Sequence, residues 1–496
     1  MGVPVGQRVY QPRDAEHGVL HAVIRAHLDD FLREAAQRGD GSGLPDFIER
    51  EFRQFLTCGV LAHGFARVRC ESCALERLVP FSCKGRGFCP SCGGRRMTER
   101  AAHLVDEVLP PVPVRQWVLT LPYRLRYLLA WDHGLSRAVL RVYMRALHEL
   151  YRRGARAQGI PGGRTGSLTV LQRFGSGLNL NVHFHTLALD GVFSGSRPGG
   201  LQFHPASPPS DEDVGRVLAT IRHRVQRLLA RRGLVGNEDG GGPPDPLAEA
   251  SLGLARMVSA SVQGRIALGP RAGTPVRRIG QAPGMVRSRG PRQAHLEGFD
   301  LHANVRVPAH DRARREQLCR YVLRPPIAKD RLRLTDDGRV LVELKTPWAD
   351  GTTHLVFEPL EFLEKLAALT PRPGVNLVIY HGVLAPHSRW RALVVAYRGG
   401  AESSGGTPAE AAAGRPRYWT WAALMRRAFD LDVLACPRCG GRLRLIATVE
   451  EPGVVRKILA HLGLLFPPDS PGPAPPGSEE LPGAAPPDAV EPLREA

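Results

Sequence analysis

The stretch SLTVLQRFGSGLNLNVHFHTLAL (167–189) contains two strand-like segments, 167–174 and 179–189, joined by a Gly-Ser-Gly turn. Both segments are rich in apolar and β-branched residues, and the glycines between them favour a tight connection. The sequence therefore predicts an antiparallel hairpin at this point of the chain.

Strand and helix patterns alternate on both sides of the hairpin. A strand at 116–122 and a helix at 134–153 precede it. An amphipathic helix at 211–232 (with Ser210 as N-cap), a strand at 299–307 and a short helix at 309–322 follow it. The order β-α-β-β-α-β is typical of a ferredoxin-like α+β fold. In that fold the first and third strands are central, and the second strand pairs with the third.

The rest of the chain is expected to form separate segments around this central domain, which we place at 110–332 with a Gly/Pro-rich insertion at about 233–297. The other expected segments are N-terminal helices with a zinc ribbon (1–100), a mixed α/β extension (333–398) with a hairpin and a helix at 359–369, a linker (399–416), a C-terminal helical segment with a CPRCGG motif (417–466) and a disordered, Pro-rich acidic tail (467–496).

Composition limits the classes of function. Of the 496 residues, 43% are hydrophobic, which excludes a wholly disordered chain. Lys and Arg number 67 against 48 acidic residues, so the net charge of +19 favours a polyanionic partner, nucleic acid first. The sequence contains no apolar run of about 18 residues, so it predicts no membrane span. The N-terminus lacks the apolar core of a signal peptide. We therefore expect a cytoplasmic protein.

Nine cysteines in a reducing compartment indicate metal ligands rather than disulfides. Cys70 and Cys73, followed after fifteen residues by Cys89 and Cys92, have the spacing of a zinc ribbon in which four thiolates hold one structural Zn²⁺. Three further side chains nearby are candidates to replace a ligand or to serve a second site: Cys58, His63 and Cys83.

The later pair Cys436 and Cys439 is half of a zinc site, which could close on Cys58, Cys83 or a histidine, or remain empty. Basic residues surround the first cysteines and favour contact with nucleic-acid phosphates. The residues assigned to this contact are Arg69, Lys84, Arg86, Arg95 and Arg96.

His183 and His185 lie two residues apart on the second hairpin strand, so both imidazoles face the same side of the sheet. Two adjacent histidines can hold a divalent cation if a third ligand is present. A turn at Ser176-Gly177-Leu178 places Gln172 opposite His183, and cross-strand partners share a face. Gln172 is therefore the expected third ligand, with His302 and Gln317 as alternatives.

Tyr321 follows the helical pattern at 309–322 and precedes a Pro-rich turn. A phenol can attack a phosphodiester when a metal polarises the phosphate and basic groups offset its charge. The basic side chains suited to that purpose are Arg320, Arg324, Lys329 and Arg331.

Taken together, the motifs resemble the HUH-type rolling-circle transposases of bacterial insertion sequences, the insertion sequence ninety-one family. The segments that carry the resemblance are CESC (70–73), FSCKGRGFCPSCGGRR (81–96), LQRFGSGLNLNVHFHTLALDGVF (171–193), FDLHANVRV (299–307), CRYVLRPPIAKDRL (319–332), HGVLAPHSRWR (381–391) and CPRCGG (436–441).

The resemblance implies an N-terminal zinc-binding domain and a catalytic domain in which His183 and His185 hold Mg²⁺ or Mn²⁺. It implies that Tyr321 nicks one DNA strand, single-stranded or in a hairpin element end, and keeps its 5′ end as a phosphotyrosine. Members with two tyrosines have the pattern Y-x-x-x-Y. Gln317 occupies the first position here, so the chain resembles the single-tyrosine branch. A second cut then requires reuse of Tyr321 or a tyrosine of another protomer, since Tyr380 fits the pattern poorly.

Two other classes of protein share part of these motifs. A rolling-circle replication initiator or conjugative relaxase would use the same histidine and tyrosine chemistry. A catalytically inactive, zinc-dependent DNA-binding protein would keep the cysteines alone. The two zinc-ligand segments and the RYVLRPP context (320–326) favour a transposase acting in a bacterial cytoplasm, associated with the nucleoid when bound to DNA.

Overall fold

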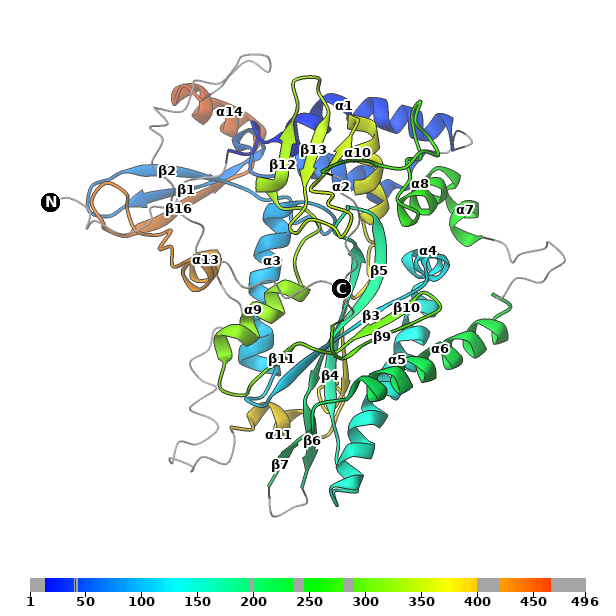
Figure 1. Cartoon of the computed structure of the whole chain (residues 1–496). Helices are drawn as coiled ribbons and strands as arrows, with labels where there is room; N and C mark the ends of the chain where they lie inside the picture. Colours follow the sequence, from blue (N-terminus) through cyan, green and yellow to red (C-terminus); the bar gives the residue numbers. More distant parts are fainter. Residues whose placement is uncertain are drawn as a thin grey trace. The chain divides into compact units, whose positions relative to one another are not determined.

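The computed structural model describes residues 14–39, 41, 43–195, 200–234, 245–280, 290–398 and 420–464 (Figure 1). These residues form two units, a smaller one from 14–16, 56–83 and 425–464, and a larger one from 17–55 and 84–424. The linker expected at 399–416 and the tail expected at 467–496 lie outside the described residues.

The larger unit is built on an antiparallel sheet in which four strands have the order β4-β5-β3-β10. The strands β3 and β5, first and third in the chain, are central, and β4 pairs with β5. The predicted ferredoxin-like order is therefore confirmed. The strands and their bounds are β3 (Val114–Thr120), β4 (Gly166–Phe174), β5 (Leu180–Leu189) and β10 (Phe299–His302).

Two further strands, absent from the sequence prediction, enlarge this sheet. β9 (Gln293–Leu296) forms a hairpin with β10 at one edge, and β15 (Val378–Gly382) pairs with β4 at the other. The segment expected as one strand at 299–307 is split, because only β11 (Arg306–Val307) resumes pairing with β3 after β10 ends.

Helices lie on both faces of the sheet. α5 (His133–Ala157) contributes Tyr143, whose ring centroid is 6.3 Å from that of the fully buried Phe184 of β5. α9 (Arg312–Val322) lies on the opposite face, where Tyr321 meets His185. α6 (Asp211–Arg231) begins at the predicted N-cap, because the Ser210 hydroxyl accepts the Asp213 N–H and the Asp213 carboxylate accepts the Ser210 N–H.

A second sheet of the larger unit has the order β12-β13-β14-β8, and the helix expected at 359–369 is present as α10. The insertion expected at 233–297 contains ordered helices that its Gly/Pro-rich composition obscures. The remaining elements of the larger unit are α1 (Val19–Gln37), α2 (Asp46–Leu56), α3 (Pro90–His103), η2 (Leu104–Val108), α4 (Tyr123–Trp131), β6 (Gly191–Ser194), β7 (Gln202–Pro205), α7 (Pro246–Ala250), α8 (Leu252–Val262), β8 (Arg277–Ile279), η3 (Lys329–Arg331), β12 (Leu332–Leu334), β13 (Val340–Glu343), β14 (His354–Phe357), α10 (Pro359–Leu369) and α11 (Arg391–Ala396).

The smaller unit joins distant parts of the chain. Its sheet has the order β16-β1-β2, and Figure 1 shows β16, in orange, beside β1, in blue. Phe65 at the start of β1 is fully buried against Val455 and Leu459 of α14. The elements are η1 (Leu61–His63), β1 (Phe65–Cys70), β2 (Glu76–Pro80), β16 (Leu443–Val449) and α14 (Pro452–His461), and α13 (Trp421–Phe429) leads into this unit.

One buried ionic network fixes the end of β5. The carboxylate of Asp190, which has no exposed surface, accepts two hydrogen bonds from Arg115 (2.9 and 3.0 Å), one from Arg306 (2.9 Å) and one from the Tyr151 hydroxyl (3.1 Å). Arg115 is itself buried and also donates to the Ala303 carbonyl. The network therefore ties β3, α5 and the segment after β10 to the strand that carries the two histidines.

Replacing Asp190 by Asn is expected to destabilise the larger unit by about 3–5 kcal/mol, because it leaves the buried Arg115 guanidinium without a countercharge. Denaturant unfolding followed by circular dichroism measures the change. Glu212→Gln, which removes one carboxylate from an exposed ion pair with Arg216, is the matched control and should cost about 1 kcal/mol or less. Equal losses in the two variants would contradict the importance of the network.

None of the described helices is both long and apolar enough to cross a lipid bilayer.

Candidate active site and zinc centre

His183 and His185 project from β5 onto the same face of the sheet, with their Nε2 atoms 3.0 Å apart. Nδ1 of His183 donates to the Asn181 carbonyl (2.7 Å), which leaves the Nε2 lone pair of His183 free to act as a ligand. Nε2 of the Gln116 amide donates to Nδ1 of His185 (2.8 Å), so the neutral His185 ring carries its proton on Nε2, which faces Nε2 of His183.

Both imidazoles are neutral near pH 7. Burial lowers the pKa of His183 to about 4, and the positive charges of Arg324 and Arg126 lower it further. Burial also lowers the pKa of His185 well below its usual value, with smaller contributions from His183 and Arg324. Metal ligation requires the neutral imidazole, so both rings carry the charge that a divalent cation needs. A cation would replace the contact between the two Nε2 atoms, with the Gln116 amide turned so that its Oε1 accepts the Nδ1–H of His185.

Gln172 lies directly opposite His183 in the pairing of β4 with β5, as the predicted hairpin register requires. Its Nε2 donates to the Val322 carbonyl (2.9 Å), while its Oε1 is buried and has no hydrogen-bond partner among the described residues. A buried acceptor without a partner is costly, and a cation would satisfy it. The two imidazoles and this amide oxygen therefore fit a divalent cation.

Tyr321 stands in the last turn of α9, next to the histidines. Its ring centroid is 5.8 Å from that of His185, and the two rings are nearly perpendicular at 86°. The Arg324 guanidinium lies over the Tyr321 ring at 4.4 Å from the centroid, and Nζ of Lys345 lies at 5.7 Å. The structure thus brings together His183, His185, Gln172 and Tyr321, which the sequence had placed on three separate segments.

The alternative third ligands occupy other positions. Gln317 is one helical turn before Tyr321 on α9. His302 lies on β10, opposite Val118 of β3, and Val118 is opposite His185, so two strand spacings separate His302 from His185. Gln172 lies on β4, directly next to the strand of the histidines, so the register places it nearer to them than His302.

Two residues of the site were missed by sequence reasoning. Gln116 is the polar first residue of the mostly apolar segment predicted as a strand at 116–122, and this contrast in polarity was the available signal. Lys345 follows a hairpin strand in the mixed region, and its proximity to Tyr321 depends on tertiary packing that no local pattern reports.

The expected zinc ribbon of Cys70, Cys73, Cys89 and Cys92 is not the group that the structure assembles. Cys70 and Cys73 instead lie with Cys436 and Cys439, and all four Sγ atoms fall within 4.8 Å of one another. The Sγ atoms of Cys70 and Cys439 are 3.5 Å apart, and those of Cys73 and Cys436 are 3.6 Å apart. The cause is the pairing of β1 with β16, which sets Cys70 opposite Leu443.

The two halves of this group are equivalent turns. The Ala74 N–H donates to the Cys70 carbonyl (3.1 Å), and the Gly440 N–H donates to the Cys436 carbonyl (2.9 Å). Ala74 and Gly440, each following the second cysteine of its pair, have positive φ angles of 56° and 73°. Hydrogen bonds from backbone N–H groups, first that of Cys73, lower the pKa of the Cys70 thiol to about 6, which favours the thiolate that binds zinc.

Cys89 and Cys92 belong to the larger unit, where Cys89 caps α3 and Cys92 lies in its first turn, and both are buried. With Cys70 and Cys73 paired elsewhere, the sequence leaves Cys58 and Cys83 as the candidate ligands to complement this pair. Cys319 is different: burial raises the pKa of its thiol to about 12, which is typical of an inert core cysteine.

The residues assigned to DNA contact are spread over both units. Arg69 is exposed on β1 of the smaller unit, whereas the others belong to the larger unit. Those of the larger unit are Lys84 and Arg86 in the loop before α3, Arg95 and Arg96 on α3, Arg320 on α9, Arg324 after α9, and Lys329 and Arg331 in η3.

Residues 166–391 match the family model described as a putative transposase, and residues 23–121 match the model described as a transposase zinc-binding domain. The chain belongs to the insertion sequence ninety-one family of transposases. The resemblance inferred from the motifs is thereby confirmed. No curated protein and no solved structure matches the chain.

As a transposase, this protein is a DNA-processing enzyme, and DNA is its partner. The transposase match contains His183, His185, Gln172 and Tyr321, and the zinc-binding match contains Cys70, Cys73, Cys89 and Cys92. Together with the four-cysteine group, the zinc-binding match supports structural Zn²⁺. Four thiolates fill a tetrahedral site and leave no position for water, so the zinc of the smaller unit is structural rather than catalytic.

Proposed function

We propose that this transposase is a metal-dependent single-strand DNA nickase and strand transferase, with Tyr321 as nucleophile. The observation that carries the proposal is the position of Tyr321, whose ring centroid lies 5.8 Å from that of His185 in the histidine pair. The nearby amide oxygen of Gln172 has no hydrogen-bond partner among the described residues. His183, His185 and Gln172 would hold Mg²⁺ or Mn²⁺. When bound, this cation acts as a Lewis acid on the scissile phosphate.

The reaction requires little else from the protein. The hydroxyl oxygen of Tyr321 attacks the phosphorus and loses its proton to solvent. The bond to the 3′ oxygen breaks, and that oxygen takes a proton to become a free 3′-OH. Tyr321 keeps the 5′ end as a phosphotyrosine, so the energy of the phosphodiester is conserved for strand transfer. Arg324 and Lys345 offset the negative charge of the phosphate.

The single tyrosine leaves two routes to a second cut. Tyr380 lies on β15, separated from the histidine strand by β4, so it is not positioned beside His183 and His185. We propose that Tyr321 is released and used again or that a second protomer supplies its Tyr321. Both routes fit the rolling-circle mode of transposition, in which the freed 3′-OH primes replication.

The direct test is incubation of the purified protein with labelled single-stranded DNA and Mn²⁺. The substrate is a pool that includes the flanks of the gene, and the products are analysed by denaturing gel and peptide mass spectrometry. A covalent adduct on Tyr321 is expected. An adduct on another tyrosine would refute the nucleophile, and tight binding without any adduct would favour the inactive zinc-dependent DNA-binding protein. A replication initiator or relaxase would also give the adduct, but would not join the cut end to a second DNA.

The metal ligands can be tested apart from cleavage. His185→Ala is expected to weaken Mn²⁺ binding more than about 100-fold, since even losing a residue that only orients a ligand costs about 10–100-fold. Gln172→Ala should weaken binding by at least tenfold, whereas His302→Ala should change it less than twofold. Calorimetric titration with Mn²⁺ measures all three variants. A larger loss for His302→Ala than for Gln172→Ala would reassign the third ligand.

A further inference from the structure

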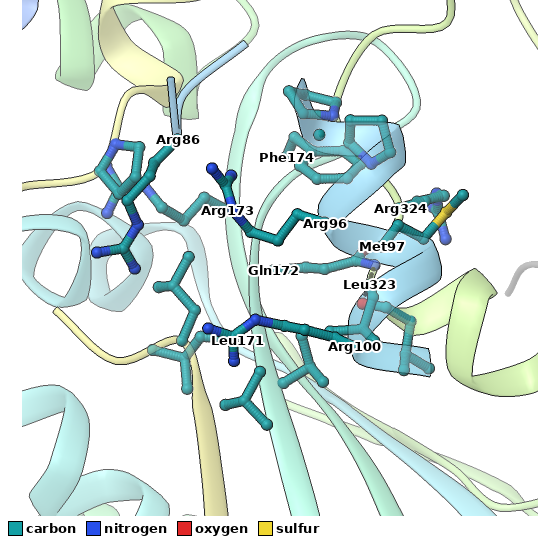
Figure 2. Close-up of a pocket in the computed structure, with 18 of the residues that line it drawn as sticks. Arg86, Arg96, Met97, Arg100, Leu171, Gln172, Arg173, Phe174, Leu323 and Arg324 are labelled. Atoms are coloured by element: carbon teal, nitrogen blue, oxygen red, sulfur yellow. Dashed lines mark hydrogen bonds between the residues drawn. The ribbon is translucent and has the colours of Figure 1, made fainter. Parts of the chain in front are cut away.

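A pocket of the larger unit adjoins the candidate active site and is rich in arginine. It lies between α3, the end of β4, the turn after α9 and the segment that follows α10, and its volume is about 140 Å³. The arginines that line it are Arg86, Arg96, Arg100, Arg173 and Arg324, and no acidic residue is among its lining residues. In Figure 2 the side chains of Arg96 and Arg100 extend from α3 across the pocket.

The guanidinium groups of this pocket lie close enough to repel one another. Arg96 and Arg100 form no ion pair within the described part of the chain, and Arg96 donates only to the backbone carbonyls of Lys84 and Gly85 (3.0 Å each). Burial, followed by repulsion from Arg86 and Arg100, lowers the pKa of Arg96. Mutual repulsion between these guanidinium groups would be relieved by an anion, and arginine suits a phosphate because it can bind it through two parallel hydrogen bonds.

Arg173 adds a buried charge whose hydrogen-bond partners within the described ranges are backbone carbonyl groups. It donates to the carbonyls of Ala130 (2.7 Å), Ala368 (3.3 Å) and Leu369 (3.3 Å), the last two at the C-terminal end of α10. Keeping a cation at such a position is costly, and a nearby phosphate would offset part of that cost.

The remaining wall of the pocket is apolar, formed by side chains that include Met97, Leu171, Phe174 and Val378. A volume of about 140 Å³ is similar to the roughly 150 Å³ cavity that accepts one benzene molecule. The pocket therefore has room for one aromatic ring but not for a duplex. An apolar wall beside arginine side chains is the combination that binds a base and its phosphate in single-stranded nucleic acid.

The pocket and the candidate active site share residues. Gln172 and Arg324 line the pocket, while Gln172 also lies opposite His183 and Arg324 covers the Tyr321 ring. α3, which supplies Arg96 and Arg100, lies within the stretch that matches the zinc-binding domain. We propose that this arginine pocket holds one nucleotide of the DNA strand next to the phosphodiester that Tyr321 attacks, with Arg96 and Arg100 on its phosphate. This inference rests on the proposed nickase function.

The test uses full-length protein with Tyr321→Phe, so that binding is measured without cleavage. Arg96→Gln combined with Arg100→Gln is expected to weaken binding of a labelled single-stranded oligonucleotide pool about tenfold or more. The slope of log affinity against log salt concentration should fall by about 0.7 for each phosphate that the variant no longer binds. Arg224→Gln is the matched control, because Arg224 is an exposed arginine of α6 that does not line the pocket, and it should change affinity less than twofold.

Photo-crosslinking identifies where the strand lies. Oligonucleotides that carry 4-thiothymidine at successive positions are expected to crosslink to peptides containing Met97 or Phe174 at one position. Crosslinks elsewhere, or an equal loss for Arg224→Gln, would overturn the pocket as a strand site. Full competition by free deoxynucleoside monophosphate would assign the pocket to free nucleotides instead. The Arg96→Gln/Arg100→Gln variant that keeps Tyr321 separates the two proposals. If it binds DNA with wild-type affinity and forms the Tyr321 adduct, the role of the pocket is refuted while the nickase function stands. If the pocket crosslinks to DNA but the wild-type protein forms no adduct, the nickase function is refuted while the pocket stands.

Discussion

Tyr321→Phe is expected to abolish formation of the covalent protein–DNA adduct and to reduce nicking by at least about 10⁴-fold, because the nucleophile is the only group removed. The ring, its edge contact with His185 and the Arg324 guanidinium above it are compatible with phenylalanine. Affinity for single-stranded DNA should therefore stay within a few-fold of the wild-type value. Denaturing gels measure the adduct, and fluorescence anisotropy measures binding.

The control for this variant is Tyr380→Phe, which removes a phenol from β15 in the same sheet. It should nick and form the adduct at the wild-type rate. Loss of DNA binding in Tyr321→Phe would assign Tyr321 to recognition rather than to catalysis. Persistent nicking in Tyr321→Phe would identify another nucleophile.

Cys439→Ser is expected to release one zinc ion per chain and to unfold the smaller unit. Structural zinc contributes about 10–16 kcal/mol to the folding of small zinc domains, more than a three-stranded sheet and one helix can replace. Elemental analysis measures the zinc content. Limited proteolysis should show cleavage appearing within 56–83 and 425–464 while the larger unit stays resistant.

Cys319→Ala is the matched control, since Cys319 is a buried thiol in α9 far in sequence from every cysteine pair. Its zinc content should equal that of the wild-type protein. The converse experiment separates the two pairings of cysteines. If Cys92→Ser and not Cys439→Ser removed the zinc held by Cys70 and Cys73, the ribbon expected from the sequence would be restored.

The core of the fold was predictable because local patterns decide it. The hairpin 167–189, the capped helix after Ser210 and the helix before Tyr321 each have short-range signals, and their order allows few topologies. The pairing of Gln172 with His183 followed from the turn alone. Strand β15 escaped prediction because its residues show no strand alternation, and it is held by pairing with β4 more than 200 residues earlier in the chain.

The zinc ligands show the opposite case. The spacing of two C-x-x-C pairs in one segment suggested a single ribbon, and only the later pair, Cys436 and Cys439, was interpreted as half of a site. Which halves combine depends on the antiparallel pairing of β1 with β16, whose residues lie more than 360 positions apart. No periodicity or spacing within one segment reports such a contact.

The origin of β16 near the end of the chain has a consequence for synthesis. A ribosome that has made the whole transposase-matching stretch, up to residue 391, has not yet translated Cys436 or Cys439. A nascent or prematurely released polypeptide therefore lacks half of the thiolates around Cys70 and cannot close that zinc site. The smaller unit can therefore fold only after residues 425–464 have been translated. Truncated transposase chains that end before these residues would lack the folded smaller unit.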